Sequence, residues 1–288
     1  MKPFPVPIRV VGPGSHVEEE ELQYLDMPRG MSVFQMPRVP QSTEVAHMTE
    51  ARRALSRLLD RMEAWDPGAP GEAPRMDLDA LDAAPLKIVN EMLGEGEVAI
   101  RIDGSRAYRI QESVFAGVWR VCELDGEGRV ARDWVEASAI PAVVHEAARA
   151  GSSPELRDVE KPEGAMNSPA LLVEIRQQMR EWRARKPAHV VNLTLFPLSP
   201  ADHEVMQQAL PVGSVAIMSR GFGNCRITST AARHVWRVQY FNNMNTLILD
   251  TLEVVDLPEV AVAAAEDLRE SRERFAELLE WMAESAES

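Results

Sequence analysis

The sequence predicts an α+β protein made of two copies of an α-ββββ-α unit, with mostly antiparallel sheets, extra helices and an irregular N-terminal segment. Two observations predict this class. One stretch of the chain recurs later without a gap, and each copy holds four β-branched runs separated by short polar turns and bracketed by helical segments. Strands joined by such short turns pair antiparallel, so each copy is expected to form a local antiparallel sheet.

The repeat extends over fifty residues. A constant shift of 117 positions superposes residues 94–143 on residues 211–260, and fifteen of the fifty positions are identical. The matches include the four-letter word VWRV, which starts at Val118 in the first copy and at Val235 in the second. Because self-similarity at a fixed shift dictates architecture, the pattern indicates an internal duplication.

Two segments precede the first copy. Residues 1–42 are rich in proline and show neither a helical nor a strand period, so they are expected to form an extended segment. Residues 43–74 contain a helix, with apolar residues at three- and four-residue spacing up to Trp65, and then a linker rich in proline and glycine.

The two repeats are placed at residues 75–150 and 199–288, the second including a C-terminal helix. Each begins with a short helix, at 85–93 and at 200–210, and Ser199 is the expected N-cap of the latter. Pro141 and Pro258 are expected to start the helices that close the repeats. Strands are predicted at 98–102, 109–110, 118–121 and 130–136, and at 215–217, 226–227, 235–238 and 247–254.

Residues 151–198 connect the repeats. They hold a polar linker, a helix whose apolar face runs from Leu171 to Trp182, and an additional strand at 190–196. The C-terminal helix carries an apolar stripe and an acidic remaining face, which is typical of a solvated amphipathic helix.

Composition excludes several classes of function. The formal net charge of −14 repels nucleic acid and anionic lipid surfaces, and no run approaches the ~18–20 apolar residues that cross a bilayer. Two isolated cysteines, and a start without the apolar core of a signal peptide, predict a cytoplasmic location. The six histidines show no paired ligand spacing. We therefore expect no metal, no cofactor and no catalytic residues, and a protein that is not an enzyme.

One segment is the candidate contact site. Residues 219–226 place two glycines around Phe222 and then present Asn224 and Cys225, while Arg220 and Arg226 are positioned to lower the pKa of the thiol. An ordinary hairpin turn with a half-buried cysteine, a partner contact and a working thiol all fit this pattern. The candidate partner-binding residues are Arg220, Gly221, Phe222, Gly223, Asn224, Cys225, Arg226, Tyr240 and Asn242.

Several blocks resemble a known family. Residues 220–229, 235–242 and 247–254, supported by 10–15 and 24–28, are similar to the HupH/HyaF/HoxQ family of hydrogenase expression/formation proteins. The resemblance implies a chaperone that binds the immature iron–sulfur small subunit of an uptake [NiFe]-hydrogenase before its export, beside a thioredoxin-like maturation partner. It brings no catalytic residues.

The acidic balance of the chain suits such a client. An export signal with a twin-arginine start is positively charged, and an acidic partner attracts it and speeds encounter. Two other hypotheses remain: a thiol-dependent redox or cluster-assembly factor that uses Cys225, and a scaffold for self-association.

Overall fold

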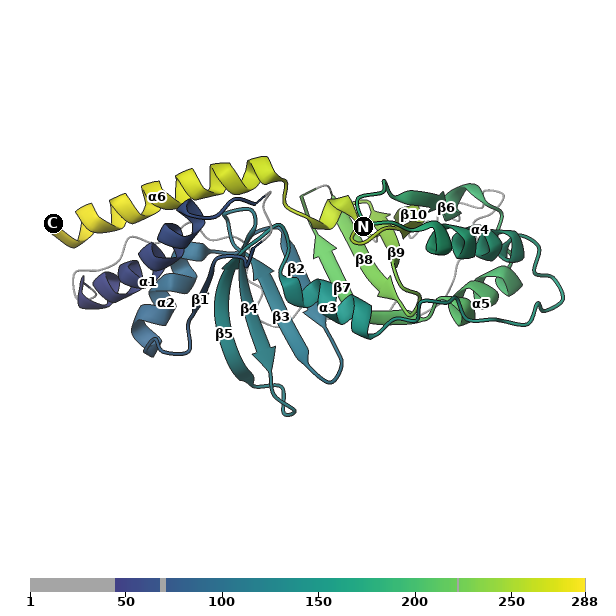
Figure 1. The fold of residues 1–288 in the computed structure, drawn as a ribbon, viewed down its shortest axis with the longest axis horizontal. Coiled ribbons are helices and arrows are strands. Elements are labelled where there is room, and N and C mark those ends of the chain that lie inside the picture. Colours follow the sequence, from purple (N-terminus) through teal and green to yellow (C-terminus); the bar gives the residue numbers. More distant parts are fainter. Residues whose placement is uncertain (1–44, 68–70, 222, 288) are drawn as a thin grey trace, which may run out of the picture.

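The computed structural model describes residues 45–67, 71–221 and 223–287, and the described chain forms one ten-stranded antiparallel sheet flanked by helices (Figure 1). The predicted α+β class and the antiparallel pairing are confirmed. The predicted extended segment at 1–42 lies outside the described residues. None of the helices in the described ranges combines the length and apolar character that a bilayer crossing requires.

The strand order is β1-β5-β4-β3-β2-β7-β8-β9-β10-β6. The strands are β1 (Arg75–Asp77), β2 (Val98–Ile102), β3 (Ala107–Glu112), β4 (Val118–Leu124), β5 (Val130–Ala137), β6 (His189–Asn192), β7 (Val212–Ser219), β8 (Asn224–Thr230), β9 (Val235–Phe241) and β10 (Leu247–Val254). The helices are α1 (Val45–Glu63), α2 (Ala83–Leu93), α3 (Ala142–Ala150), α4 (Ser168–Glu181), α5 (Pro200–Ala209) and α6 (Ala265–Glu287), with short 3-10 helices η2 (Leu193–Leu195) and η3 (Glu259–Ala261).

Two predicted elements are shorter in the structure. The strand expected at 190–196 ends at Asn192, whose side chain accepts a hydrogen bond from Thr194 N and starts η2 instead. Pro258 was expected to start the helix that closes the second repeat, but it precedes only the single turn of η3. The long C-terminal helix begins seven residues later, at Ala265. The Ser199 cap is confirmed, since its hydroxyl accepts from Asp202 N at 3.1 Å and the Asp202 carboxylate accepts from Ser199 N in return.

Two units with the same order of elements lie side by side in the sheet. The first contains β2 to β5 and the second β7 to β10. Arg120 and Asp133 form a two-point ion pair at 2.6 and 3.1 Å, and Arg237 and Asp250, 117 positions later, form the same pair at 2.6 and 3.0 Å. Positive φ angles also recur, at Gly117 (77°) and His234 (63°), and at Gly128 (78°) and Asn245 (57°). The duplication itself stays a prediction, while the shared geometry is a property of the fold.

The units join through an antiparallel pairing of β2 with β7. Ile100 lies opposite Ile217, and the register continues symmetrically to Val98 opposite Ser219 and Ile102 opposite Val215. Ile100 and Ile217 are themselves related by the shift of 117. The junction is therefore self-complementary, like the interface of a two-fold symmetric dimer.

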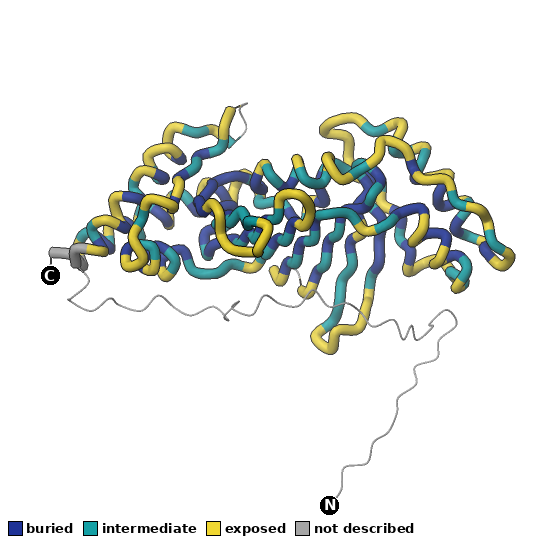
Figure 2. Tube along the Cα trace, turned by 90° about the horizontal axis from the view of Figure 1, so that it is seen from below, coloured by how far each residue is buried: buried dark blue, intermediate teal, exposed yellow. Residues whose placement is uncertain are grey.

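Three apolar cores stabilise the sheet. The central core is common to both units and contains the fully buried Trp119, Trp134 and Trp236 beneath α3 and η3. One outer core packs α1, α2 and α6 on the first unit, and the other packs α4 and α5 on the second. Figure 2 shows buried residues concentrated along the strands and exposed ones on turns and outer helix faces.

The C-terminal helix α6 packs away from the unit that precedes it. It runs beside α1 at the end of the molecule that carries the first unit (Figure 1), where Phe275, Leu279 and Met282 are buried. The predicted division of the chain grouped this helix with residues 199–288. In space it completes the outer core of the first unit instead.

Candidate partner-binding surface

The predicted residues gather at one end of the second unit. Arg220, Gly221 and Gly223 form the exposed turn between β7 and β8, and Asn224 begins β8 as an exposed residue. Phe222 lies outside the described residues. The structure joins the two strands by a hairpin, so the segment is a turn between strands, as the sequence predicted.

Neighbouring strands bring the remaining predicted residues to the same end. Cys225 pairs with Tyr240 of β9, and Arg226 extends over the ring of Phe241 with 5.5 Å between guanidinium carbon and ring centroid. Asn242 follows β9 directly. The described members of the predicted set therefore form one contiguous group, with Cys225 beneath it.

The β7–β8 turn is held by the first unit. Arg220 N donates to Glu97 O at 3.1 Å, and the Glu97 carboxylate lies against the backbone of Gly221. Gly223 has a φ of +89°, a conformation that residues with a side chain rarely adopt. The turn thus rests on the connection between α2 and β2, and its position depends on the joint between the units.

The adjacent β9–β10 turn is fixed by one amide side chain. Asn242 Oδ1 accepts from Met244 N and from Thr246 N, each at 2.9 Å, and Asn245 adopts a φ of 57°. This Asx-type turn holds the Met244 side chain outward, with 82% of its surface exposed.

Exposed apolar side chains continue from this turn along the edge of the sheet. Asp250 N donates to Thr194 Oγ1 at 2.8 Å, which places η2 beside the start of β10. We call this group the apolar corner; its members, with their exposed fractions, are Leu195 (77%), Phe196 (40%), Met244 (82%), Leu247 (44%) and Ile248 (56%). Apolar residues clustered on a surface mark a site of interaction.

No group of three or more His, Cys, Asp or Glu side chains in the described part of the chain is placed to hold a metal ion. The geometry of this end of the molecule, with exposed turns beside an apolar surface, is suited to contact with another protein.

The family of the chain follows from its sequence match. Residues 48–158 and 165–282 match the conserved C-terminal region of HupH hydrogenase expression proteins. The chain belongs to this HupH family.

Relatives that match over nearly all of this chain have names that refer to hydrogenase. Hydrogenase expression/formation protein HoxQ of Cupriavidus necator is 47% identical, with 98% of this chain and 99% of the relative covered. Hydrogenase expression/formation protein HupH of Rhodobacter capsulatus is 41% identical, with 96% and 98% covered. Hydrogenase-1 operon protein HyaF of Escherichia coli is 31% identical, with 96% and 97% covered. The solved hydrogenase expression protein HupH from Thiobacillus denitrificans shares 26% identity over 41% of this chain and 96% of its own, with a TM-score of 0.36.

The expectation of an activated thiol is wrong for this HupH-family chain. Cys225 is only 2% exposed, and burial raises the pKa of its thiol to about 11, while a hydrogen bond with Tyr240 opposes the shift and the nearby Glu253 charge adds to it. The groups that shift this pKa include neither Arg220 nor Arg226. A neutral, buried thiol is a poor nucleophile at physiological pH.

The apolar corner was not found from the sequence. Residues 247–254 and 190–196 were both predicted as strands. No local sequence pattern, however, indicated that these two segments would lie together at the edge of the sheet. One signal was available. Leu247, Ile248 and Leu249 are three consecutive apolar residues, and successive side chains of a strand point to opposite faces, so they cannot all face one core.

Proposed function

We propose that this HupH-family protein is a cytoplasmic maturation chaperone that binds the immature iron–sulfur small subunit of an uptake [NiFe]-hydrogenase before its export. The family supports a role in hydrogenase expression and formation. The observation that carries the binding role is the apolar corner, which adjoins the exposed β7–β8 and β9–β10 turns. A thioredoxin-like maturation protein is the second proposed partner.

An apolar surface of this kind suits an unfinished client. A subunit that has not yet received its clusters exposes apolar segments that later become buried, and a chaperone surface covers them in the meantime. Polar groups on the neighbouring strand β8 and in the β9–β10 turn, Asn224, Arg226 and Asn242 among them, supply hydrogen-bonding groups of the kind found at the rim of protein interfaces.

Charge adds long-range attraction to this contact. The chain has a formal net charge of −14, and the start of an export signal with two arginines is positive. Opposite charges speed the encounter and the effect weakens with added salt. The chaperone role needs no reaction centre, so we propose that the protein is not an enzyme.

The test is recovery of the small-subunit precursor with the tagged full-length chain from cells that produce hydrogenase. Met244→Asp combined with Leu247→Asp places two charges in the apolar corner, where both side chains are exposed and the fold is expected to survive. We expect recovered precursor to fall at least about tenfold, because charges at a contact centre remove more than ~1.4 kcal/mol of binding.

Val130→Asp is the matched control. Val130 is 56% exposed and occupies the position of Leu247 in the first unit, since the two differ by 117. We expect this variant to recover the precursor like the native chain. If the native chain never associates with the precursor, the proposed function is wrong; if the double variant binds as well as Val130→Asp, the surface is wrong.

The thiol hypothesis is tested in the same assay. The burial of Cys225 and its raised pKa speak against a reaction at the sulfur. We therefore expect Cys225→Ser to recover the precursor and to support hydrogenase maturation like the native chain. Loss of maturation with normal precursor binding would favour the thiol-dependent factor.

A further inference from the structure

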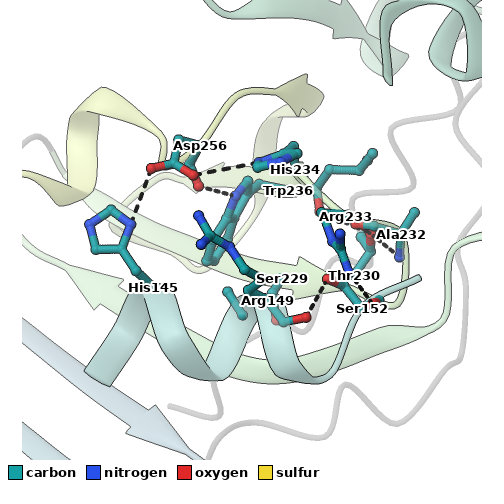
Figure 3. A pocket seen from close by; sticks show the side chains of 12 residues that line it. His145, Arg149, Ser152, Ser229, Thr230, Ala232, Arg233, His234, Trp236 and Asp256 are labelled. Atoms are coloured by element: carbon teal, nitrogen blue, oxygen red, sulfur yellow. Dashed lines mark hydrogen bonds and ion pairs between the residues drawn. The ribbon is translucent and has the colours of Figure 1, made fainter. Parts of the chain in front are cut away.

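A small polar pocket lies in the second unit, between α3 and the connection of β8 to β9 (Figure 3). Its cavity volume is about 20 Å³, room for roughly one water molecule or the oxygen of a small ion. His145 and Arg149 line it from α3, and Arg233, His234 and Ser229 line it from the sheet side. The pocket is separate from the apolar corner, none of whose residues line it.

Positive charge in the pocket exceeds the negative charge. Arg149 makes no ion pair within 4.0 Å with any described residue, and Arg233 Nε is buried without a hydrogen-bond acceptor. The rest of the Arg233 guanidinium has only Ser152 O, at 3.5 Å from Nη2. Burying a guanidinium N–H without a hydrogen-bond acceptor costs free energy. The described residues place no acceptor oxygen beside Arg233 Nε.

The carboxylate of the pocket is already shared. Asp256 Oδ2 lies 3.2 Å from His145 Nδ1, and Asp256 Oδ1 lies 3.5 Å from His234 Nδ1. Burial lowers the pKa of His234, Asp256 opposes this, and the positive charges of Arg149 and Arg233 lower it further. The histidine thus lies within the field of both arginines, with a single carboxylate to balance them.

The first unit shows what fills the equivalent place. There, 117 positions before Ser229, stands Glu112, a buried carboxylate that accepts a hydrogen bond from Gly117 N at 2.9 Å and another from Val98 N. In the second unit the hydroxyl of Ser229 accepts from Val215 N at 3.0 Å, which is the counterpart of Val98. The serine side chain is two atoms shorter than glutamate, and Ser229 lines the pocket.

We infer that this pocket is a binding site for a compact oxyanion, a carboxylate or a phosphate, which takes the place that the Glu112 carboxylate occupies in the first unit. Guanidinium groups are the side chains best suited to such oxygens, because their fixed N–H groups match the geometry of carboxylates and phosphates. The free Arg233 Nε–H and the exposed Arg149 supply two donors from opposite walls.

The test titrates the full-length protein with sodium phosphate and, separately, with sodium acetate at constant ionic strength kept with chloride. Histidine labelled with ¹³C at Cε1 reports the pocket through His145 and His234. We expect saturable shifts of these two signals with phosphate or acetate and none with chloride, and the tighter of the two anions identifies the oxyanion type. Shifts that are the same for all three anions would overturn the site.

Variants locate the site. Arg233→Gln and Arg149→Gln are each expected to weaken anion binding at least about tenfold, since each removes a charge-assisted donor. Arg129→Gln is the control, because Arg129 is an exposed arginine in the turn between β4 and β5 of the first unit. Native affinity in both pocket variants would contradict the inference.

Ser229→Glu transfers the first unit's carboxylate into the second. We expect this variant to show no histidine response to phosphate or acetate, because the pocket then holds its own oxyanion. A response as strong as that of the native protein would overturn the equivalence with Glu112. If the variant does not fold, the two arginine variants decide the question.

Discussion

Glu112 is a buried carboxylate at the end of β3, and the environment disfavours its charge. Burial raises its pKa to about 7; the hydrogen bond from Gly117 N opposes the shift, and the charges of Glu97 and Asp267 add to it. With 7% of its surface exposed, the side chain has little access to water. At neutral pH the protein therefore carries part of the cost of a buried charge.

The pH dependence of stability follows from this raised pKa. Between pH ~4.5 and ~7 the folded state keeps a proton on Glu112 that the unfolded state releases, so stability falls as the pH rises through this window. Glu112→Gln replaces the carboxyl group by an amide that does not titrate, so the variant does not carry the cost of a buried charge at neutral pH. We expect the free energy of unfolding of the variant, relative to native, to improve by about 2–3 kcal/mol from pH 5 to pH 8.

Urea unfolding at pH 5, 6, 7 and 8 measures this difference. Glu146→Gln on the exposed face of α3 is the control, and its stability is expected to follow the native pH curve. Parallel curves for Glu112→Gln and native protein would show that Glu112 is not the group responsible.

Of the hydrogen bonds that Asp202 accepts, the sequence indicates the local ones and not the distant ones. The capping box with Ser199 was half predicted, because a Ser-Pro start is a local pattern. The other carboxylate oxygen, Oδ1, accepts from Met166 N, Asn167 N and Ser168 N at 2.8, 3.0 and 2.8 Å. That contact ties the start of α4 to α5 across 34 residues, and such a distance leaves no local signal.

At the scale of elements, the strands that could be predicted are those flanked by turn residues in the sequence. Residues 98–102 and 247–254 were predicted with the bounds that β2 and β10 have, because turn residues flank each β-branched run. The three-residue β1 was missed, since it is a strand only by virtue of pairing with β5. The strand at 190–196 stopped early because Asn192 caps a turn with its own side chain. Elements that form through contacts with distant parts of the chain, and not through a local sequence pattern, could not be predicted from the sequence.

The helix α6 was predicted as an amphipathic element, but its partner was not predictable. Phe275 is fully buried and lies edge-on to Phe115 of the first unit, with ring centroids 5.1 Å apart and an interplanar angle of 81°. Leu268 of the same helix covers Gly117 so closely that a side chain at that position would clash. The helix thus closes the first unit from the far end of the chain.

Removing this closure should cost stability in the first unit. Phe275→Ala is expected to lower the free energy of unfolding by about 3–5 kcal/mol, the usual cost of truncating a buried phenylalanine. Glu277→Ala, two residues later on the same helix, is the control and is expected to change stability by less than ~0.5 kcal/mol. Urea denaturation measures both. A loss below ~1 kcal/mol for Phe275→Ala would mean that α6 contributes little to the fold.

At the scale of the whole molecule, one sheet and one central core make the two units a single body. The pairing of β2 with β7 and the core around Trp119 and Trp236 extend across the joint. The sequence left the packing of the units open, because a pairing between strands more than a hundred residues apart has no local trace. The position of the candidate site depends on how the two units pack, because Glu97 of the first unit supports the turn at Gly221 of the second.

Ile100→Ala tests whether the units unfold together. Ile100 belongs to the first unit, but it is 2% exposed in the shared core and lies opposite Ile217. The cavity is expected to cost about 2–5 kcal/mol and, because the core is shared, to speed amide hydrogen exchange in β8 and β9 as much as in β3 and β4. Exchange measured by mass spectrometry resolves the strands. Faster exchange confined to β3 and β4 would show that the second unit, and the surface it carries, folds without the first.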